Sequence, residues 1–92
     1  MPEEDSNYEI IFSPQARRSL RKLPPNIQQR VNDNILALAE NPRPPGVKAL
    51  QGVRGLLRLR VGEYRVVYRI EDRQLIVVVV QIGHRRDIYR QR

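Results

Sequence analysis

The apolar residues of the N-terminal half follow first the pattern of a strand and then the repeat of a helix. Tyr8 to Phe12 is rich in β-branched and aromatic residues, which predicts a short strand. Ser13-Pro14 combines a helix-capping serine with a proline suited to the first helical turn. The helix should end at Pro24-Pro25. Its apolar stripe has spacings of four and three residues and consists of Ala16, Leu20 and Leu23.

A second apolar stripe predicts a helix that begins near Pro25 or Asn26 and stops at Asn41-Pro42. The residues on its apolar face are Ile27, Val31, Ile35 and Leu38. Because only a short break separates the two helices, they should form an antiparallel hairpin.

The C-terminal half is typical of a β-meander. Residues 42–55 are rich in proline and glycine and predict a loop. Three strands should follow, with turns at Gly62-Glu63 and Asp72-Arg73: Leu56 to Val61, Tyr64 to Ile70, and the apolar Leu75 to Ile82, which suits a central strand. The predicted fold class is therefore α+β: an N-terminal strand, a two-helix hairpin and a three-stranded antiparallel meander, with the helices on one face of the sheet.

Size and composition narrow the class of protein. The 92 residues fit one domain, expected over residues 8–92 after a flexible tail of residues 1–7. Without cysteine, and with one histidine, no disulfide framework or common zinc site is expected. The longest apolar run is far too short for a bilayer, so no membrane span is expected. The acidic N-terminus is unlike a secretory signal, which makes the cytoplasm the default location.

The positive charge is concentrated in one half of the chain. Residues 1–46 hold six basic and six acidic side chains, whereas residues 47–92 hold eleven basic and four acidic ones, a net of +7. Ten of those eleven cations are arginine, whose planar guanidinium suits bidentate contact with phosphate and stacking on bases. A phosphate-bearing partner is favoured, although a merely soluble basic surface, an acidic protein or an anionic membrane would also fit this charge.

The turn at Gly62-Glu63 fixes the register of the predicted hairpin. It places Arg60 opposite Arg65, with Arg58 on the same face, and like charges directly opposite one another destabilise a sheet by up to roughly 1 kcal/mol. An anion bound between them would account for the arrangement. The alternative is that each guanidinium lies in water or pairs with Glu63, Glu71 or Asp87, as surface ion pairs commonly do.

The same face also carries aliphatic side chains, namely Val67, Ile76, Val78 and Val80. Such a mixed surface suits a partner that is at times an anionic backbone and at times an amphipathic protein segment.

Three strings of residues resemble the RelE family, within the RelE/ParE superfamily of type II toxins. They are Lys48-Ala49-Leu50-Gln51-Gly52, the stretch from Leu57 to Tyr68 with its Gly62-Glu63-Tyr64-Arg65 turn, and Ile82-Gly83-His84-Arg85-Arg86-Asp87-Ile88-Tyr89. The first half resembles the family through Ile11-Phe12-Ser13-Pro14 and Lys22-Leu23-Pro24. Together these cover about residues 8–90.

The resemblance implies a toxin that cleaves messenger RNA in the ribosomal A site. Cleavage would proceed without metal or other cofactor, through attack of the RNA 2′-hydroxyl on the adjacent phosphorus. A co-expressed antitoxin would hold the toxin inactive by wrapping it with helices and extended segments. The fold implied is a four-stranded antiparallel sheet with two helices on one face.

The resemblance also suggests roles for individual residues. Arg65 matches the family's arginine at the scissile phosphate, Arg85 the arginine at the following strand end, and Tyr89 the tyrosine that stacks on a base. Arg58 and Leu56 stand where well-studied members have lysine, and an arginine cannot serve as a base. Arg58 is therefore expected to stabilise charge. Further RNA contacts are expected from Lys48, Arg54, Arg60 and Arg86.

His84 is the side chain whose ordinary pKa lies near neutrality, and it is a candidate general acid or base. It could equally be a solvated residue after the last strand. Tyr89 could donate a proton, stack on a base or cap the core. Lys48 is either a phosphate contact or an ordinary loop lysine.

Two alternative functions remain open. The first is a ParE-like protein, which has the same fold but poisons DNA gyrase. This alternative stays open because Leu56 and Arg58 replace the lysines of well-studied RelE members. A non-catalytic RNA-binding relative that has kept its antitoxin contacts is the other.

Overall fold

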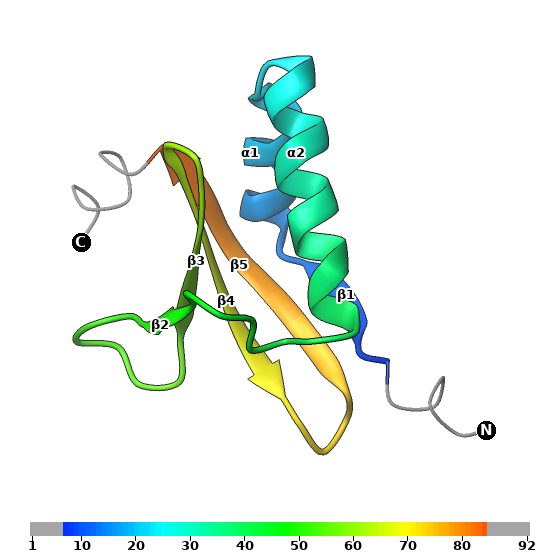
Figure 1. Ribbon diagram of the computed structural model, residues 1–92, viewed down its shortest axis with the longest axis vertical. Coiled ribbons are helices and arrows are strands. Elements are labelled where there is room, and N and C mark those ends of the chain that lie inside the picture. Colours follow the sequence, from blue (N-terminus) through cyan, green and yellow to red (C-terminus); the bar gives the residue numbers. More distant parts are fainter. Residues whose placement is uncertain (1–6, 85–92) are drawn as a thin grey trace.

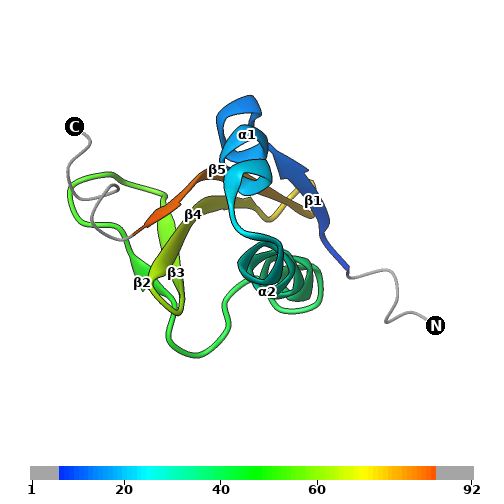
Figure 2. The ribbon, with the colours of Figure 1, turned by 90° about the horizontal axis from the view of Figure 1, so that it is seen from above.

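The computed structural model describes residues 7–84. The elements in chain order are β1 (Glu9–Phe12), α1 (Pro14–Lys22), α2 (Pro25–Leu36) with a 3-10 turn (Ala37–Ala39), β2 (Lys48–Ala49), β3 (Leu57–Val61), β4 (Tyr64–Glu71) and β5 (Ile76–His84). The five strands form one sheet in the order β1-β5-β4-β3-β2. Both helices lie together beside the sheet, and β2 with its following loop lies at the far edge from them (Figures 1 and 2). The α+β prediction is confirmed. None of the helices in the described part of the chain is long and apolar enough to cross a membrane.

The predicted start of the first helix is confirmed in atomic detail. The Ser13 hydroxyl accepts a hydrogen bond from the backbone N–H of Ala16 at 3.0 Å, and Pro14 occupies the first turn. The same hydroxyl donates to the Val80 carbonyl of β5 at 2.8 Å. Such a cap is worth about 1 kcal/mol, and the second bond ties the start of α1 to the sheet.

The core lies between the helices and one face of the sheet. The helices contribute residues of the predicted stripes, which are Ala16, Val31, Ile35 and Leu38. The sheet contributes alternate residues of β3, β4 and β5, which are Leu59, Val61, Val66, Tyr68, Val77, Val79 and Ile82. Since side chains alternate along a strand, the intervening residues of β3 and β4 point away from the helices.

The expected four-stranded antiparallel sheet is wrong in two respects. Lys48 and Ala49, expected in a loop, pair with Arg58 and Leu57 as the fifth strand. In addition, β1 runs parallel to β5. The N–H of Glu9 donates to the Leu75 carbonyl and that of Ser13 to the Val79 carbonyl, so both strands advance in the same direction. Pairing between segments this far apart in sequence leaves no local signal.

The last strand begins one residue later than expected and extends further. Leu75 belongs to the turn after β4 and has a φ of 56°, an unfavourable conformation for a residue with a β-carbon. The pairing of β4 with β5 shifts register between Val67 and Tyr68, so Val80 has no partner on β4. This bulge, at the carbonyl that Ser13 contacts, changes which residues of β5 face the core.

The loop before β2 is held by bonds to the sheet. The buried Tyr68 hydroxyl donates to the Pro42 carbonyl at 2.7 Å. Arg43 pairs with Asp72 at 2.9 Å, and the Tyr8 hydroxyl also donates to this carboxylate. These contacts keep the pKa of Asp72 below its usual value, chiefly through the hydrogen bond from Arg43.

Candidate functional site

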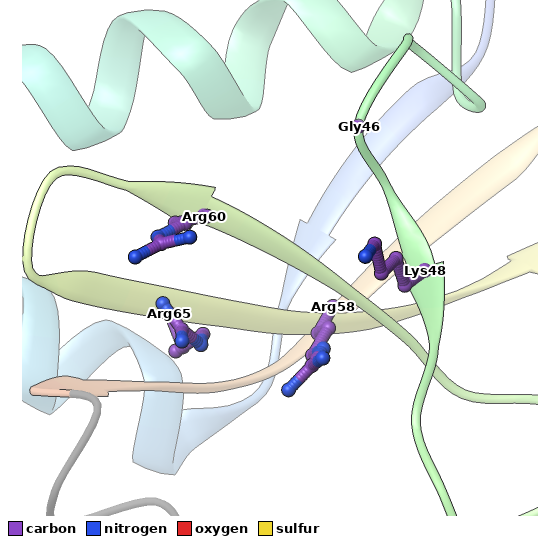
Figure 3. A pocket seen from close by; sticks show the side chains of 5 residues that line it. All are labelled: Gly46, Lys48, Arg58, Arg60 and Arg65. Carbon is purple, nitrogen blue, oxygen red and sulfur yellow. The ribbon is translucent and has the colours of Figure 1, made fainter.

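A cavity of about 80 Å³ opens on the sheet face that points away from the helices. Its lining is Gly46, Lys48, Arg58, Arg60 and Arg65. Figure 3 shows Arg58 and Arg60 on β3, Arg65 on the neighbouring β4, and Lys48 across the cavity on β2. The volume exceeds the roughly 10–15 Å³ that one water molecule needs, so a small anionic group fits.

The strand register explains why these cations meet. Arg60 lies directly opposite Arg65, as the sequence predicts, and Lys48 lies directly opposite Arg58. Arg58 and Arg60 are two residues apart on β3, so all four side chains lie on one face. Each opposed pair of like charges costs a few tenths to roughly 1 kcal/mol. An anion bound between them would stabilise two such pairs side by side.

The cations of the cavity differ in burial. Arg65 is 7% exposed, and its Nε and Nη1 atoms are shielded from solvent. The neighbouring Val67, 1% exposed, lies on the same face and outside the helix-facing core. Arg60 and Lys48 are exposed. The site therefore has one buried guanidinium at its base and exposed cations at its rim.

Gly46 was not foreseen as part of this site, and Lys48, a predicted RNA contact, was expected in a loop and not on a strand. The N–H of Val47 donates to the Pro44 carbonyl, and Gly46 has a φ of +90°, so Pro45 and Gly46 occupy the central positions of a type II turn. The sequence does contain this signal in Pro44-Pro45-Gly46. A strand of two residues, by contrast, gives no periodicity that could reveal it.

His84 is the last residue of β5 and does not follow the strand as expected. It lies opposite Tyr64, and the two rings are 5.5 Å apart in an edge-on contact. Because directly paired residues share a face, His84 lies on the side of Tyr64 and not on that of the arginines. Its proposed role in proton transfer stays a prediction.

The remaining predicted residues are distributed as follows. Arg54 lies exposed in the loop between β2 and β3 and does not line the cavity. Arg85, Arg86 and Tyr89 lie outside the described residues. The structure therefore brings together Lys48, Arg58, Arg60 and Arg65, four of the nine residues predicted for the site.

The chemistry of the lining is that of an anion site. Guanidinium and ammonium groups donate hydrogen bonds and offer no lone pair to a metal ion. Among residues 7–84, no three His, Asp or Glu side chains gather as metal ligands would. Three guanidiniums around one small cavity suit a phosphate, which accepts paired N–H donors from arginine.

The sequence matches the family described as ParE toxin of type II toxin-antitoxin system, parDE, over residues 10–89. Toxin RelG of Mycobacterium tuberculosis is 38% identical over 84 residues, which are 90% of this chain and 97% of that protein. The mRNA interferase toxin RelE of Escherichia coli is 29% identical over 80 residues, 85% of this chain and 83% of that protein.

Solved structures show the same fold. The toxin–antitoxin complex RelBE2 of Mycobacterium tuberculosis contains a chain with a TM-score of 0.77 and 35% identity, covering 85% of this chain and 91% of that one. In the intact RelBE complex of Escherichia coli, the TM-score is 0.72 and the identity 26%, over 84% of this chain and 95% of that one. With the sequence matched over most of its length and the fold shared, this chain belongs to the RelE family of toxins of type II toxin–antitoxin systems.

Proposed function

We propose that this toxin is a ribosome-dependent endoribonuclease that cleaves messenger RNA in the ribosomal A site. The observation that carries the proposal is the cavity in which Arg58, Arg60 and Arg65 converge with Lys48. A relative 29% identical over 80 residues is named an mRNA interferase, and the same chemistry fits the cationic site here.

The proposed reaction is attack of the RNA 2′-hydroxyl on the adjacent phosphorus, which expels the 5′-oxygen of the next nucleotide and leaves a cyclic phosphate. Negative charge gathers on the phosphorane oxygens as the bond forms. Arg65, fixed by burial, stabilises that charge with little reorganisation, and Arg58 assists from the neighbouring strand. Arg60 and Lys48 at the rim bind flanking phosphates.

Two protons must also move, one from the 2′-hydroxyl and one to the leaving oxygen. Arg58 cannot remove a proton at ordinary pH. The proposal keeps His84 as acid or base, which requires the RNA to extend past the end of β5, because His84 lies beside Tyr64 on the face away from the arginines. Tyr89 is assigned as proton donor or base-stacking residue, and Arg85 adds positive charge. This scheme assigns no step to a metal ion held by the toxin.

The proposal includes a cognate antitoxin as partner. The matched structures include complexes named RelBE toxin–antitoxin complexes. The arginine face also carries exposed Ile11 and half-buried Val78, which lie opposite one another on β1 and β5. An antitoxin segment with acidic and aliphatic side chains would cover both kinds of surface. The toxin should copurify with such a protein.

The test is to express the toxin briefly and map new RNA ends on translated and untranslated messages. We expect cuts within translated codons only, and a loss of about 10²–10³ in rate in Arg65→Ala. Arg69→Ala is the matched control, because Arg69 lies four residues along β4 on the same face and pairs with Glu71 outside the cavity. Equal losses in both variants would contradict the proposal.

Poisoning of DNA gyrase is the second candidate, favoured by the description of the matched family as ParE. Intact RNA together with arrested DNA replication after expression would establish it in place of cleavage. Antitoxin binding without either effect would identify a non-catalytic relative.

A further inference from the structure

A second basic surface lies on the other side of the molecule, on helix α1. It consists of Arg17, Arg18, Arg21 and Lys22, all exposed. None of these four side chains forms an ion pair with a carboxylate in residues 7–84. Because α1 packs against the core-facing side of the sheet, this surface is separate from the arginine cavity on the opposite face.

Folding explains only part of this charge. Arg21 and Lys22 in the last turn interact favourably with the helix dipole, which is worth roughly 0.3–1 kcal/mol each. Arg17 and Arg18 are not in the last turn. They form like-charged pairs with Arg21 and Lys22 at spacings of four residues, and each such pair costs roughly 0.2–0.5 kcal/mol. Arg17 stacks on the Phe12 ring at 5.5 Å, but Arg18 has no comparable contact among the described residues.

A polar hollow of about 310 Å³ adjoins this helix. Leu20 of α1 forms part of its lining, and the remainder comes from α2, namely Pro25, Gln28, Gln29 and Asn32. The three amides both donate and accept hydrogen bonds. The minor groove of double-helical RNA displays 2′-hydroxyls, which also donate and accept, next to the phosphates of its two strands.

We propose that the basic face of α1 and this hollow dock on the backbone and minor groove of double-helical RNA. A protein partner fits less well, since the centres of protein interfaces are depleted of charge, whereas interfaces with nucleic acids are polar and positively charged. The contact is distinct from the substrate strand in the arginine cavity. This docking rests on the proposed function in one respect: a ribosome-dependent toxin meets such helices in the folded ribosomal RNA around its substrate.

The test compares two double variants with the same net charge. Arg18→Gln/Arg21→Gln removes two cations from α1, and Arg69→Gln/Arg73→Gln removes two exposed cations beyond the cavity, so both carry +5 in place of +7. Binding is measured to vacant ribosomes without message and to a duplex RNA of about 16 base pairs, the span of a typical duplex-binding domain. Circular dichroism checks that both variants fold.

We expect the α1 variant to bind both probes at least tenfold more weakly. The slope of log affinity against log salt should fall by about 0.9 for each phosphate that the variant no longer neutralises, and the control variant should change much less. Equal losses in the two variants would overturn the proposal. Unchanged binding of the α1 variant would overturn it as well.

A second variant examines the amides separately from charge. Gln28→Ala/Asn32→Ala should reduce the preference for duplex RNA over duplex DNA of the same sequence, because DNA lacks the 2′-hydroxyl. An unchanged preference would remove the hollow from the docking surface. The two proposals can fail separately. If the wild-type toxin cleaves RNA and the α1 variant binds ribosomes fully, only the docking surface is refuted. If the wild-type toxin does not cleave RNA but the α1 variant binds ribosomes more weakly, only the nuclease is refuted.

Discussion

At the scale of single residues, the site contains pairs of like charges directly opposite one another, an arrangement that lowers the stability of a sheet. Arg60 and Arg65 face each other across β3 and β4, and the burial of Arg65 reduces the screening of their repulsion by water. The neighbouring pair of Lys48 and Arg58 repeats the arrangement. Clusters of like charge that a fold tolerates at a cost are typical of functional sites.

Arg60→Gln should therefore raise the stability of the toxin while it weakens RNA cleavage. Removing one member of the opposed pair relieves a few tenths to roughly 1 kcal/mol of repulsion, measurable as a higher urea midpoint at low salt. The gain should shrink as salt screens the pair. Arg69→Gln serves as control, since it breaks the ion pair with Glu71 and should leave stability equal or slightly lower. A lower midpoint for Arg60→Gln would mean that Arg60 is a structural residue.

His84→Ala should slow cleavage without weakening ribosome binding. The imidazole is the ordinary group for proton transfer near neutral pH, and removal of a general acid or base typically costs about 10²–10⁴ in rate. Single-turnover cleavage and ribosome affinity are measured separately. The alternative is a structural role, because His84 packs edge-on against the Tyr64 ring. An unchanged cleavage rate together with reduced thermal stability in His84→Ala would show that role.

At the scale of elements, one buried hydrogen bond anchors the segment that carries the cavity's rim. Tyr68 on β4 has no exposed surface, and its hydroxyl donates to the carbonyl of Pro42. From there the chain runs through the Pro44–Val47 turn to Lys48 on β2. Burial raises the pKa of Tyr68 to about 12.

This pKa gives a testable pH dependence. An unfolded tyrosine loses its proton near pH 10, whereas folded Tyr68 keeps its proton to about 12, so the contribution of Tyr68 to stability is full below pH 10 and is lost between about 10 and 12. Tyr68→Phe should remove this part of the alkaline loss, measured by urea unfolding at each pH. It should also cost about 1–3 kcal/mol at neutral pH, since the Pro42 carbonyl loses its donor. An identical alkaline profile in both proteins would contradict the assignment. Tyr64→Phe, at a half-buried tyrosine, is the control.

At the scale of the whole molecule, the elements follow from the sequence better than their arrangement does. The helix starts and the register of β3 with β4 are predicted correctly, because a capping serine, a proline in the first turn and a two-residue turn are local signals. The α-helix α2 ends earlier than predicted, at Leu36, and a 3-10 turn continues to Ala39. The parallel β1 and the two-residue β2 are missed, because each depends on pairing with residues elsewhere in the chain. The cluster of Arg58, Arg60 and Arg65 is predicted correctly because all three lie on one hairpin, whose register a local turn sets. Lys48 joins them from β2, which lies outside that hairpin.

The opposed cations lie on one face of the sheet, and a bound oligonucleotide would neutralise their charge. We therefore expect an oligonucleotide to stabilise the whole fold. A 2′-deoxy trinucleotide lacks the attacking hydroxyl and so should bind in the arginine cavity without being cut. A ligand that binds only the folded state stabilises it by RT ln(1 + [L]/Kd), about 2.7 kcal/mol at a hundredfold excess over Kd. Relief of repulsion in both opposed pairs should make this gain steeply dependent on salt. The measurement is the thermal midpoint against trinucleotide concentration, repeated at a low and a high NaCl concentration, with the ionic strength held constant within each titration. In Arg58→Gln/Arg65→Gln the rise should vanish, whereas Arg69→Gln/Arg73→Gln should keep it. A rise of equal size in both variants would show that the trinucleotide binds elsewhere, through the general positive charge of the toxin.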